Sequence, residues 1–167
     1  MKTDIDSLIA DLTCDQMMKC QDARLKLVAM GSVAVPALVE ALLSRKQWVR
    51  WEAAKALSQI GDPASAEALI KALEDKVFDI RWIAAEGLVG IGKDALVPLL
   101  KALIGNSDSV WLRGSAHHLL TDMYLDELEE VLKPVITALE GLEPSVTVPV
   151  AAEIALDKLR KVRIARE

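Results

Sequence analysis

A repeated segment constrains this chain more than any other feature of its sequence. VRWEAAKALSQIG at residues 49–61 aligns with IRWIAAEGLVGIG at residues 80–92, displaced by 31 residues, and the two share Arg-Trp, a pair of alanines, a leucine and a final Ile-Gly. A further displacement of 31 gives a third copy in which Trp111 falls on Ile80, and a fainter copy upstream ends at Gly31. Self-similarity at such a period indicates a repeat architecture.

Shorter apolar units lie between these copies, and each follows a turn. They read VPALVEAL at 35–42, AEALIKAL at 66–73, VPLLKAL at 97–103 and KPVITAL at 133–139. The turn at residues 61–63 is Gly-Asp-Pro, in which glycine suits the left-handed end of one helix and Asp or Pro opens the next. The repeating unit is therefore predicted to be helix, turn, helix.

One such helix pair cannot bury its apolar face alone, so successive pairs must stack around a shared core. We predict an all-α fold, an α-solenoid of about five helix pairs without β-sheet, as a single domain over residues 1–167. The repeats are expected near 15–44, 47–74, 77–104 and 108–140, with a capping helix near 146–164.

Composition favours a soluble protein with a closely packed helical core. Apolar residues form 52% of the chain and aromatic residues only 4%, so the core must consist largely of Ala, Leu, Val and Ile. No stretch reaches the roughly 18 to 20 apolar residues of a membrane span. The N-terminal sequence has acids where a secretion signal has bases, so we expect a cytoplasmic protein whose Cys14 and Cys20 are reduced thiols.

Charge argues against a nucleic-acid partner. The net charge of −5 includes five bases and one acid in the last ten residues, so residues 1–157 carry 15 bases against 24 acids, or −9. A surface that negative repels a phosphate backbone. The basic C-terminal end is typical of a solvated helix terminus.

The repeat resembles a known family, the HEAT-like repeats first described in phycobilin lyases. The resemblance rests on VRWEAAKALSQIGDPASAEALIKAL and extends over residues 20–160. It implies the solenoid fold but says little about function, because such repeats occur in lyases, hydroxylases, DNA-repair proteins and scaffolds.

A helical wheel of residues 49–60 separates a core stripe from an outer face. The stripe consists of Val49, Ala53, Ala56, Leu57 and Ile60. The resemblance implies that the outer face lines a concave groove. Its predicted members in the three copies are Trp48, Trp51, Lys55, Phe78, Trp82, Glu86, Arg113 and His117, whereas Trp111 takes a core position. The alternative is that the tryptophans pack on the next repeat or on a second copy of the chain.

Other residues are expected to be structural. Gly61 and Gly92 end helices, and the resemblance implies that Arg50 and Arg81 bind acids or turn carbonyls of a neighbouring repeat. The candidate acids are Asp62, Asp75 and Asp108, and Leu112 occupies the third arginine position.

The sequence offers little support for catalysis. His117 and His118 are adjacent, so they point about 100° apart on a helix and do not clamp one metal ion as a pair at i and i+4 does. No nucleophile elbow or glycine-rich phosphate loop is present. We expect no catalytic residue, no metal, no cofactor and no enzymatic activity.

The predicted function is a scaffold that binds a protein or peptide in the aromatic groove, as a monomer or weak homodimer, without nucleic acid or membrane. Trp and Arg are among the side chains that contribute most binding energy at protein interfaces, which favours this interpretation. One alternative is a protein that binds bilin or another tetrapyrrole, since aromatic rings stack on flat pigments. Another is an alkylpurine DNA glycosylase, which requires a basic channel.

Overall fold

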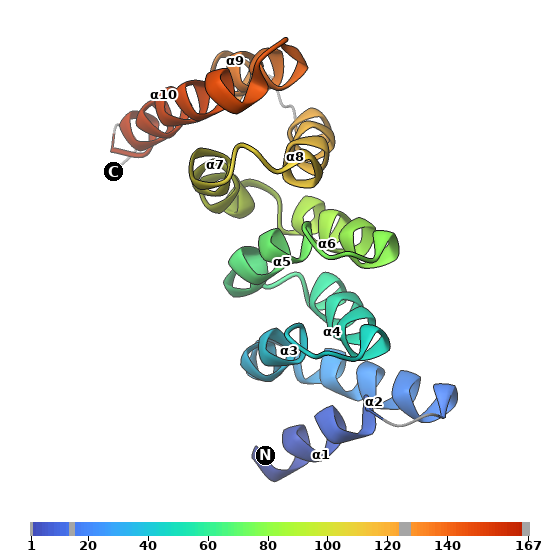
Figure 1. The fold of residues 1–167 in the computed structure, drawn as a ribbon. Helices are drawn as coiled ribbons and strands as arrows, with labels where there is room; N and C mark the ends of the chain where they lie inside the picture. Colours follow the sequence, from blue (N-terminus) through green and yellow to red (C-terminus); the bar gives the residue numbers. More distant parts are fainter. Residues whose placement is uncertain (1, 14–15, 124–127, 165–167) are drawn as a thin grey trace. The chain divides into compact units, whose positions relative to one another are not determined.

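The computed structural model describes residues 2–13, 16–123 and 128–164, and every regular element within those ranges is helical. The α-helices are α1 (Lys2–Asp11), α2 (Met17–Met30), α3 (Val35–Ala41), α4 (Gln47–Ile60), α5 (Ala66–Ala72), α6 (Phe78–Ile91), α7 (Leu96–Gly105), α8 (Val110–Asp122), α9 (Glu129–Glu140) and α10 (Pro144–Ile164) (Figure 1). Three short 3₁₀ helices open α3, α5 and α7: η1 (Gly31–Ala34), η2 (Pro63–Ser65) and η3 (Gly92–Ala95).

Longer and shorter helices alternate along the chain, as the repeat predicts. α2, α4 and α6 have 14 residues each and α8 has 13, whereas α3 and α5 have 7. The predicted all-α solenoid is confirmed. Within the described ranges, no helix combines the length and the hydropathy that crossing a membrane requires.

The helices form two compact units, Met1–Ile91 and Gly92–Glu167, which are described in turn. The expected repeats at 15–44, 47–74 and 108–140 enclose α2 with α3, α4 with α5, and α8 with α9. The single domain expected over residues 1–167 stays a prediction.

In the first unit, α4 lies between α2 and α6 and packs on both (Figure 1). α3 packs on α4, and α5 packs on α6. The predicted core stripe of α4 is buried, with Val49 at 2% exposure and the two alanines and Leu57 at 0%, while Ile60 is half-buried. The core position of the stripe predicted for α4 is therefore confirmed for these four residues.

The turn after α4 has the predicted geometry. Gly61 is in the left-handed region at φ +64°, and its N–H donates to the carbonyl of Leu57 at 3.0 Å. Asp62 then accepts the N–H of Ala64 at 2.8 Å, which caps η2. A hydrogen bond from the Ser32 hydroxyl, together with that N–H, lowers the pKa of Asp62 below its ordinary value. Gly92 has the same positive φ, +70°.

In the second unit, α10 packs along α9 and α7, and α8 packs on α7 and α9. The buried face of α10 consists of Val148, Ala152, Ala155 and Leu156. The capping helix predicted near 146–164 corresponds to α10, which begins two residues earlier. Its opposite face is solvent-exposed and carries several of the apolar side chains of this unit.

The register predicted for the third copy is wrong. Trp111, expected in the core, is 48% exposed, whereas Leu112 is 1% exposed and occupies the position that Ile80 holds in α6. The true displacement is therefore 32 residues. Leu103 lies 30 residues after Leu73, and the connection from Leu103 to Leu112 is two residues longer than that from Leu73 to Ile80. The net displacement is therefore 32, and a constant spacing of 31 misplaces α8 by one residue.

Candidate functional site

Four aromatic side chains of the first unit lie outside its core. We call Trp48 and Trp51 of α4, with Phe78 and Trp82 of α6, the aromatic surface. The exposed fractions are 43% for Trp48, 63% for Phe78 and 51% for Trp82, and Trp51 is half-buried. Phe78 and Trp82 lie one helical turn apart and stack, with ring centroids 6.4 Å apart and planes inclined at 29°. A cluster of large aromatic rings on a solvent-exposed surface is uncommon in a protein that has no binding partner.

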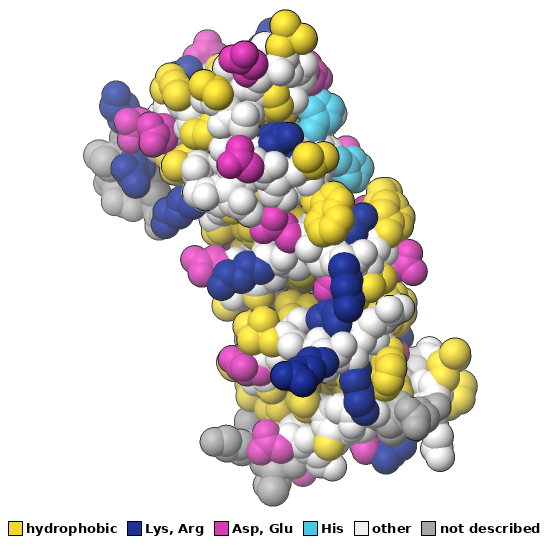
Figure 2. All heavy atoms as spheres, viewed as in Figure 1, with side chains coloured by type: hydrophobic (Ala, Val, Ile, Leu, Met, Phe, Trp, Pro, Cys, Tyr) yellow, Lys and Arg dark blue, Asp and Glu magenta, His cyan; other side chains and the backbone are white. Residues whose placement is uncertain are grey.

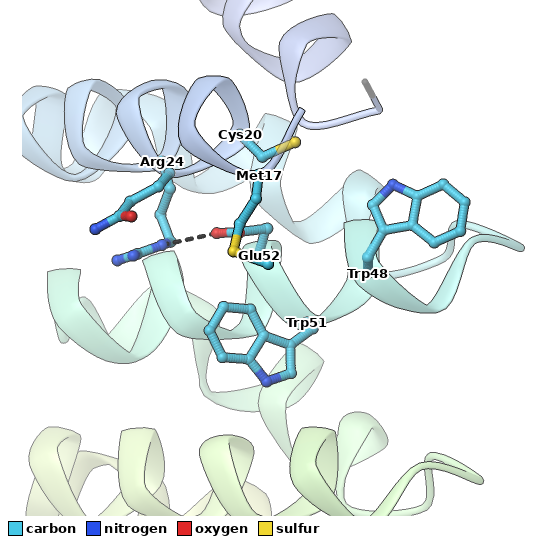
Figure 3. A pocket seen from close by; sticks show the side chains of 7 residues that line it. Met17, Cys20, Arg24, Trp48, Trp51 and Glu52 are labelled. Atoms are coloured by element: carbon cyan, nitrogen blue, oxygen red, sulfur yellow. Dashed lines mark hydrogen bonds and ion pairs between the residues drawn. The ribbon is translucent and has the colours of Figure 1, made fainter. Parts of the chain in front are cut away.

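A cavity of about 630 Å³ lies between α2 and α4 (Figure 3). Trp48 and Trp51 project from α4 on one side, while Met17 and Cys20 come from α2. The rest of the lining is Gln21, Arg24 and Glu52. A volume between about 300 and 1,000 Å³ is typical of ligand pockets, and the largely apolar wall suits an apolar or aromatic group.

An ion pair that the sequence interpretation missed links α2 and α4 at this cavity. Arg24 Nε lies 2.7 Å from Glu52 Oε2, and Arg24 Nη1 lies 2.6 Å from Gln59 Oε1. Both charged residues are only 8% exposed. One signal for the pair was present, because Glu52 occupies the position that Ile83 holds in the next copy, and an acid at a core position requires a partner.

A second cavity, of about 580 Å³, lies between α4 and α6. Its lining consists of Trp51, Lys55, Phe78, Asp79, Trp82 and Ile83. Trp51 also lines the first cavity, so its indole is the wall shared by the two. Of the other residues predicted for the groove, Lys55 is half-buried in this lining and Glu86 is exposed on α6.

Cationic side chains lie over two of the rings. Lys46 Nζ is 5.2 Å from the Trp48 ring centroid, and the guanidinium of Arg81 is 5.6 Å from that of Phe78. Figure 2 shows Lys and Arg side chains interleaved with hydrophobic ones over α4 and α6. Each cation–π contact contributes about 0.5–1 kcal/mol at an exposed site and holds its ring in one orientation.

Arg50 pairs with Asp75, one of the three candidate acids. Nε and Nη2 of Arg50 donate to the two carboxylate oxygens of Asp75 at 2.6 and 3.0 Å, and Nη1 donates to the carbonyl of Ser44 at 2.9 Å. Burial by itself raises the pKa of Asp75, but the hydrogen bonds from Arg50 and from the Val77 N–H and the nearby positive charges outweigh it, so the pKa is lowered. The same carboxylate raises the pKa of Arg50.

This ion pair gives a pH-dependent contribution to stability. Because the pKa of Asp75 is lower in the folded protein, the contribution is complete above the ordinary carboxyl value of about 4 and is lost as pH falls through the folded value. We expect Asp75→Asn to lower the free energy of unfolding by about 2 kcal/mol at pH 7. In urea denaturation, the difference in unfolding free energy between wild type and variant should become smaller below about pH 4. A gap that is constant down to pH 2 would contradict the assignment.

The series of Arg50 and Arg81 continues in Arg113, a residue predicted to line the groove. Arg50, Arg81 and Arg113 each donate from Nη1 to the carbonyl of the residue six positions earlier, which is Ser44, Asp75 and Ser107 respectively. Arg113 therefore makes the same turn contact as the other two arginines, and its place in the groove stays a prediction. The expectation that Leu112 interrupts the series followed from the one-residue error in register.

His117 belongs to the second unit and pairs with α9. Its Nε2 lies 2.9 Å from Glu140 Oε1, and 40% of its side chain is exposed. In the corrected register Trp51 and Trp82 correspond to Gly114, and Lys55 and Glu86 correspond to His118. The aromatic surface is thus a feature of α4 and α6, and the extension of one groove to Arg113 and His117 stays a prediction.

The described residues include no group of three or more His, Cys, Asp or Glu side chains arranged to hold a metal ion. Cys20 is buried, with its thiol 3.8 Å from the carbonyl oxygen of Leu12. Cys14 lies outside the described residues.

Comparison with known proteins bears on the fold. A family model described as HEAT repeats matches residues 25–89, which contain α3, α4, α5, most of α6 and the C-terminal part of α2. The HEAT-like repeat predicted from the sequence is thereby confirmed, and both aromatic helices belong to it. No curated protein sequence matches the chain.

Two solved structures resemble this chain over most of its length. A structure of the complex of CpcE and CpcF of phycocyanin lyase from Nostoc sp. PCC7120 matches 93% of this chain and 99% of its own, with 23% identity and a TM-score of 0.60. An engineered protein matches 92% of this chain and 78% of its own, with 21% identity and a TM-score of 0.47. At such identities the first likeness concerns the fold alone.

Proposed function

We propose that this HEAT-repeat protein is a non-catalytic scaffold that binds a protein or peptide segment through its aromatic surface. The observation that carries the proposal is the pair of cavities on either side of Trp51, both edged by exposed rings. Indoles bring large contact areas at a small cost in side-chain entropy, and Trp is enriched among residues that dominate interface energies.

The two cavities suit a segment that inserts one apolar side chain on each side of Trp51. Lys46 and Arg81 hold two of the rings before a partner arrives, which reduces the ordering cost of binding. The Arg24–Glu52 pair is satisfied without a partner, so it fixes the floor of the first cavity. A rigid surface with pre-positioned rings needs no further chemistry to act as a scaffold.

The test is loss of partner capture on removal of both central indoles. We expect Trp51→Ala/Trp82→Ala to lose the proteins that the wild type retains from a lysate of the native cells. Because both rings lie outside the core, unfolding free energy should change by about 1 kcal/mol or less. Trp111→Ala is the matched control, since Trp111 is 48% exposed on α8. If all three proteins retain the same set in quantitative mass spectrometry, the proposal fails.

A second candidate is binding of a tetrapyrrole, which the first cavity favours because two indoles line it and it has the volume of a small-ligand pocket. The fold likeness to a structure of phycocyanin lyase is compatible with it. Titration with biliverdin should then shift the absorbance of the pigment, and Trp48→Ala should weaken that binding. An unchanged pigment spectrum at saturating protein would eliminate this candidate.

A further inference from the structure

Positive charge lies along one edge of the aromatic surface. α4 and α6 run in the same direction, because Trp51 lies beside Phe78 near their beginnings and Ser58 meets Gly87 nearer their ends. The edge at which both helices begin carries Lys46 over the Trp48 ring and Arg81 over the Phe78 ring. Trp48 lines the first cavity and Phe78 lines the second, so each cavity has a ring with a cation beside it.

Backbone oxygens hold these two cations in place. Lys46 Nζ lies 3.3 Å from the carbonyl oxygen of Thr13, and Arg81 Nη1 donates to the carbonyl of Asp75 at 2.7 Å. A carbonyl accepts a hydrogen bond but carries no net charge, so these contacts position the cations without neutralising them. The carboxylate of Asp75 is bound by Arg50.

The other charges of α4, of α6 and of the turns before them leave a positive balance. Two acids in residues 44–60 and 74–91 are bound by arginine, Glu52 by Arg24 and Asp75 by Arg50. Apart from these pairs, the bases are Arg45, Lys46, Lys55, Lys76 and Arg81, and the acids are Glu74, Asp79 and Glu86. This surface therefore carries +2, whereas the unit Met1–Ile91 has 11 bases and 13 acids.

The three acids do not cancel the charge at the edge. Asp79 lines the second cavity together with Lys55, so these two charges offset one another there. Glu86 is exposed farther along α6, and Glu74 is half-buried in the turn before that helix. On neighbouring α2, the exposed lysines have acids of their own, since Lys19 pairs with Asp11 and Lys26 with Asp22.

We propose that the segment bound by the aromatic surface is acidic, with apolar side chains in the two cavities and carboxylates beside Lys46 and Arg81. The inference rests on the proposed function and adds the chemistry of the partner. Figure 2 shows Lys and Arg side chains among hydrophobic ones along α4 and α6. A carboxylate that reaches either cation gains a charge-assisted hydrogen bond, and the positive edge orients the approaching segment.

A short peptide is long enough to reach both cavities. They lie on either side of α4, so their separation is about the 8–10 Å spacing of packed helices. An extended chain covers that distance in about three residues. A peptide can also place its acids beside the two cations and an apolar residue beside Asp79, whereas a nucleic-acid strand carries a phosphate at every nucleotide.

Random peptides of about twelve residues, displayed on phage and selected on the full chain, test the proposal. We expect the selected peptides to combine Asp or Glu with apolar residues. The net charge of −5 by itself favours basic peptides, so enrichment of acidic ones reports the local charge. Neutral or basic peptides that lose binding to Trp51→Ala/Trp82→Ala would overturn the acidic partner and leave the proposed function standing. Peptides that this double variant binds as tightly as wild type would instead contradict the proposed function.

Charge reversal tests the role of Lys46 with one selected peptide. In fluorescence anisotropy at low salt, Lys46→Glu should raise the Kd about fivefold, because a carboxylate replaces the cation at the edge. Lys71→Glu is the matched control, since Lys71 is exposed on α5 and lines a separate cavity with residues of α3, and it should change the Kd by less than about twofold. Equal effects of the two variants would overturn the proposal. Circular dichroism verifies that both are folded.

A labelled strand of about twelve thymidine nucleotides is the competing probe. We expect it to bind the wild type more weakly than the selected peptide does. Tighter binding of the strand than of the peptide, weakened by Lys46→Glu, would assign this edge to nucleic acid and overturn the proposal.

Discussion

Glu52→Ile is expected to lower the free energy of unfolding by about 3 kcal/mol, because it leaves the buried guanidinium of Arg24 without its carboxylate. The new side chain fits its position, since Ile83 occupies the same position in α6 and is 7% exposed. The loss therefore reports the uncompensated charge rather than a steric clash. Denaturation in urea at pH 7 measures it.

The double variant Arg24→Met/Glu52→Ile separates the charge from the packing. Replacement of a buried ion pair by apolar side chains of similar size is often neutral, so we expect the double variant within about 1 kcal/mol of wild type. Asp22→Ala is the control on α2, since Asp22 pairs with Lys26 at the surface and should contribute about 0.5 kcal/mol or less. Equal losses in the single and double variants would show that the pair itself stabilises the contact of α2 with α4.

Gly87→Leu is expected to destabilise the first unit by about 3 kcal/mol, because the space around Gly87 leaves no room for a larger side chain. A Cβ atom at this position would lie 3.1 Å from the Ser58 Cα atom and 3.1 Å from Leu69 Cδ1. The backbone of α4 cannot move aside without widening the spacing between α4 and α6. The same change would alter the second cavity and the distance between Trp51 and Trp82.

Gly90→Leu is the matched control on the same helix. A Cβ atom there meets nothing within 4 Å, so the change should stabilise α6 by up to about 1 kcal/mol through helix propensity. Thermal unfolding of the two variants should therefore shift in opposite directions. Similar shifts for both would mean that the helices tolerate a wider spacing.

The repeat in the sequence predicted the helix pairs because burial on both sides of α4 and α6 imposes the same apolar positions on each copy. The outward direction of Trp48 and Trp82 followed from helical geometry alone. The register of α8 did not follow, because insertions in the connecting turns alter linear spacing without altering the core. Leu112 and Trp111 are neighbours, so one inserted residue exchanges a core side chain for a surface one.

The Arg24–Glu52 pair escaped prediction for a different reason. Its two residues are 28 positions apart, and Arg24 lies in the fainter upstream copy of the repeat. A helical wheel of one helix does not show which side chains the neighbouring helix brings against it. The choice of Asp75 rather than Asp62 or Asp108 as the partner of Arg50 likewise depends on the path of the turn before α6.

Asp75 lies in the turn between α5 and α6 and connects α4 with α6 through hydrogen bonds. Its carboxylate is held by the arginine of α4, and its carbonyl is held by Arg81 of α6. Displacement of Asp75 therefore breaks a hydrogen-bonded contact of both guanidinium groups at once. Unfolding that begins in α4 or α6 therefore also breaks the contact of the other helix with the turn between α5 and α6. These neighbouring repeats should unfold together, in one cooperative step.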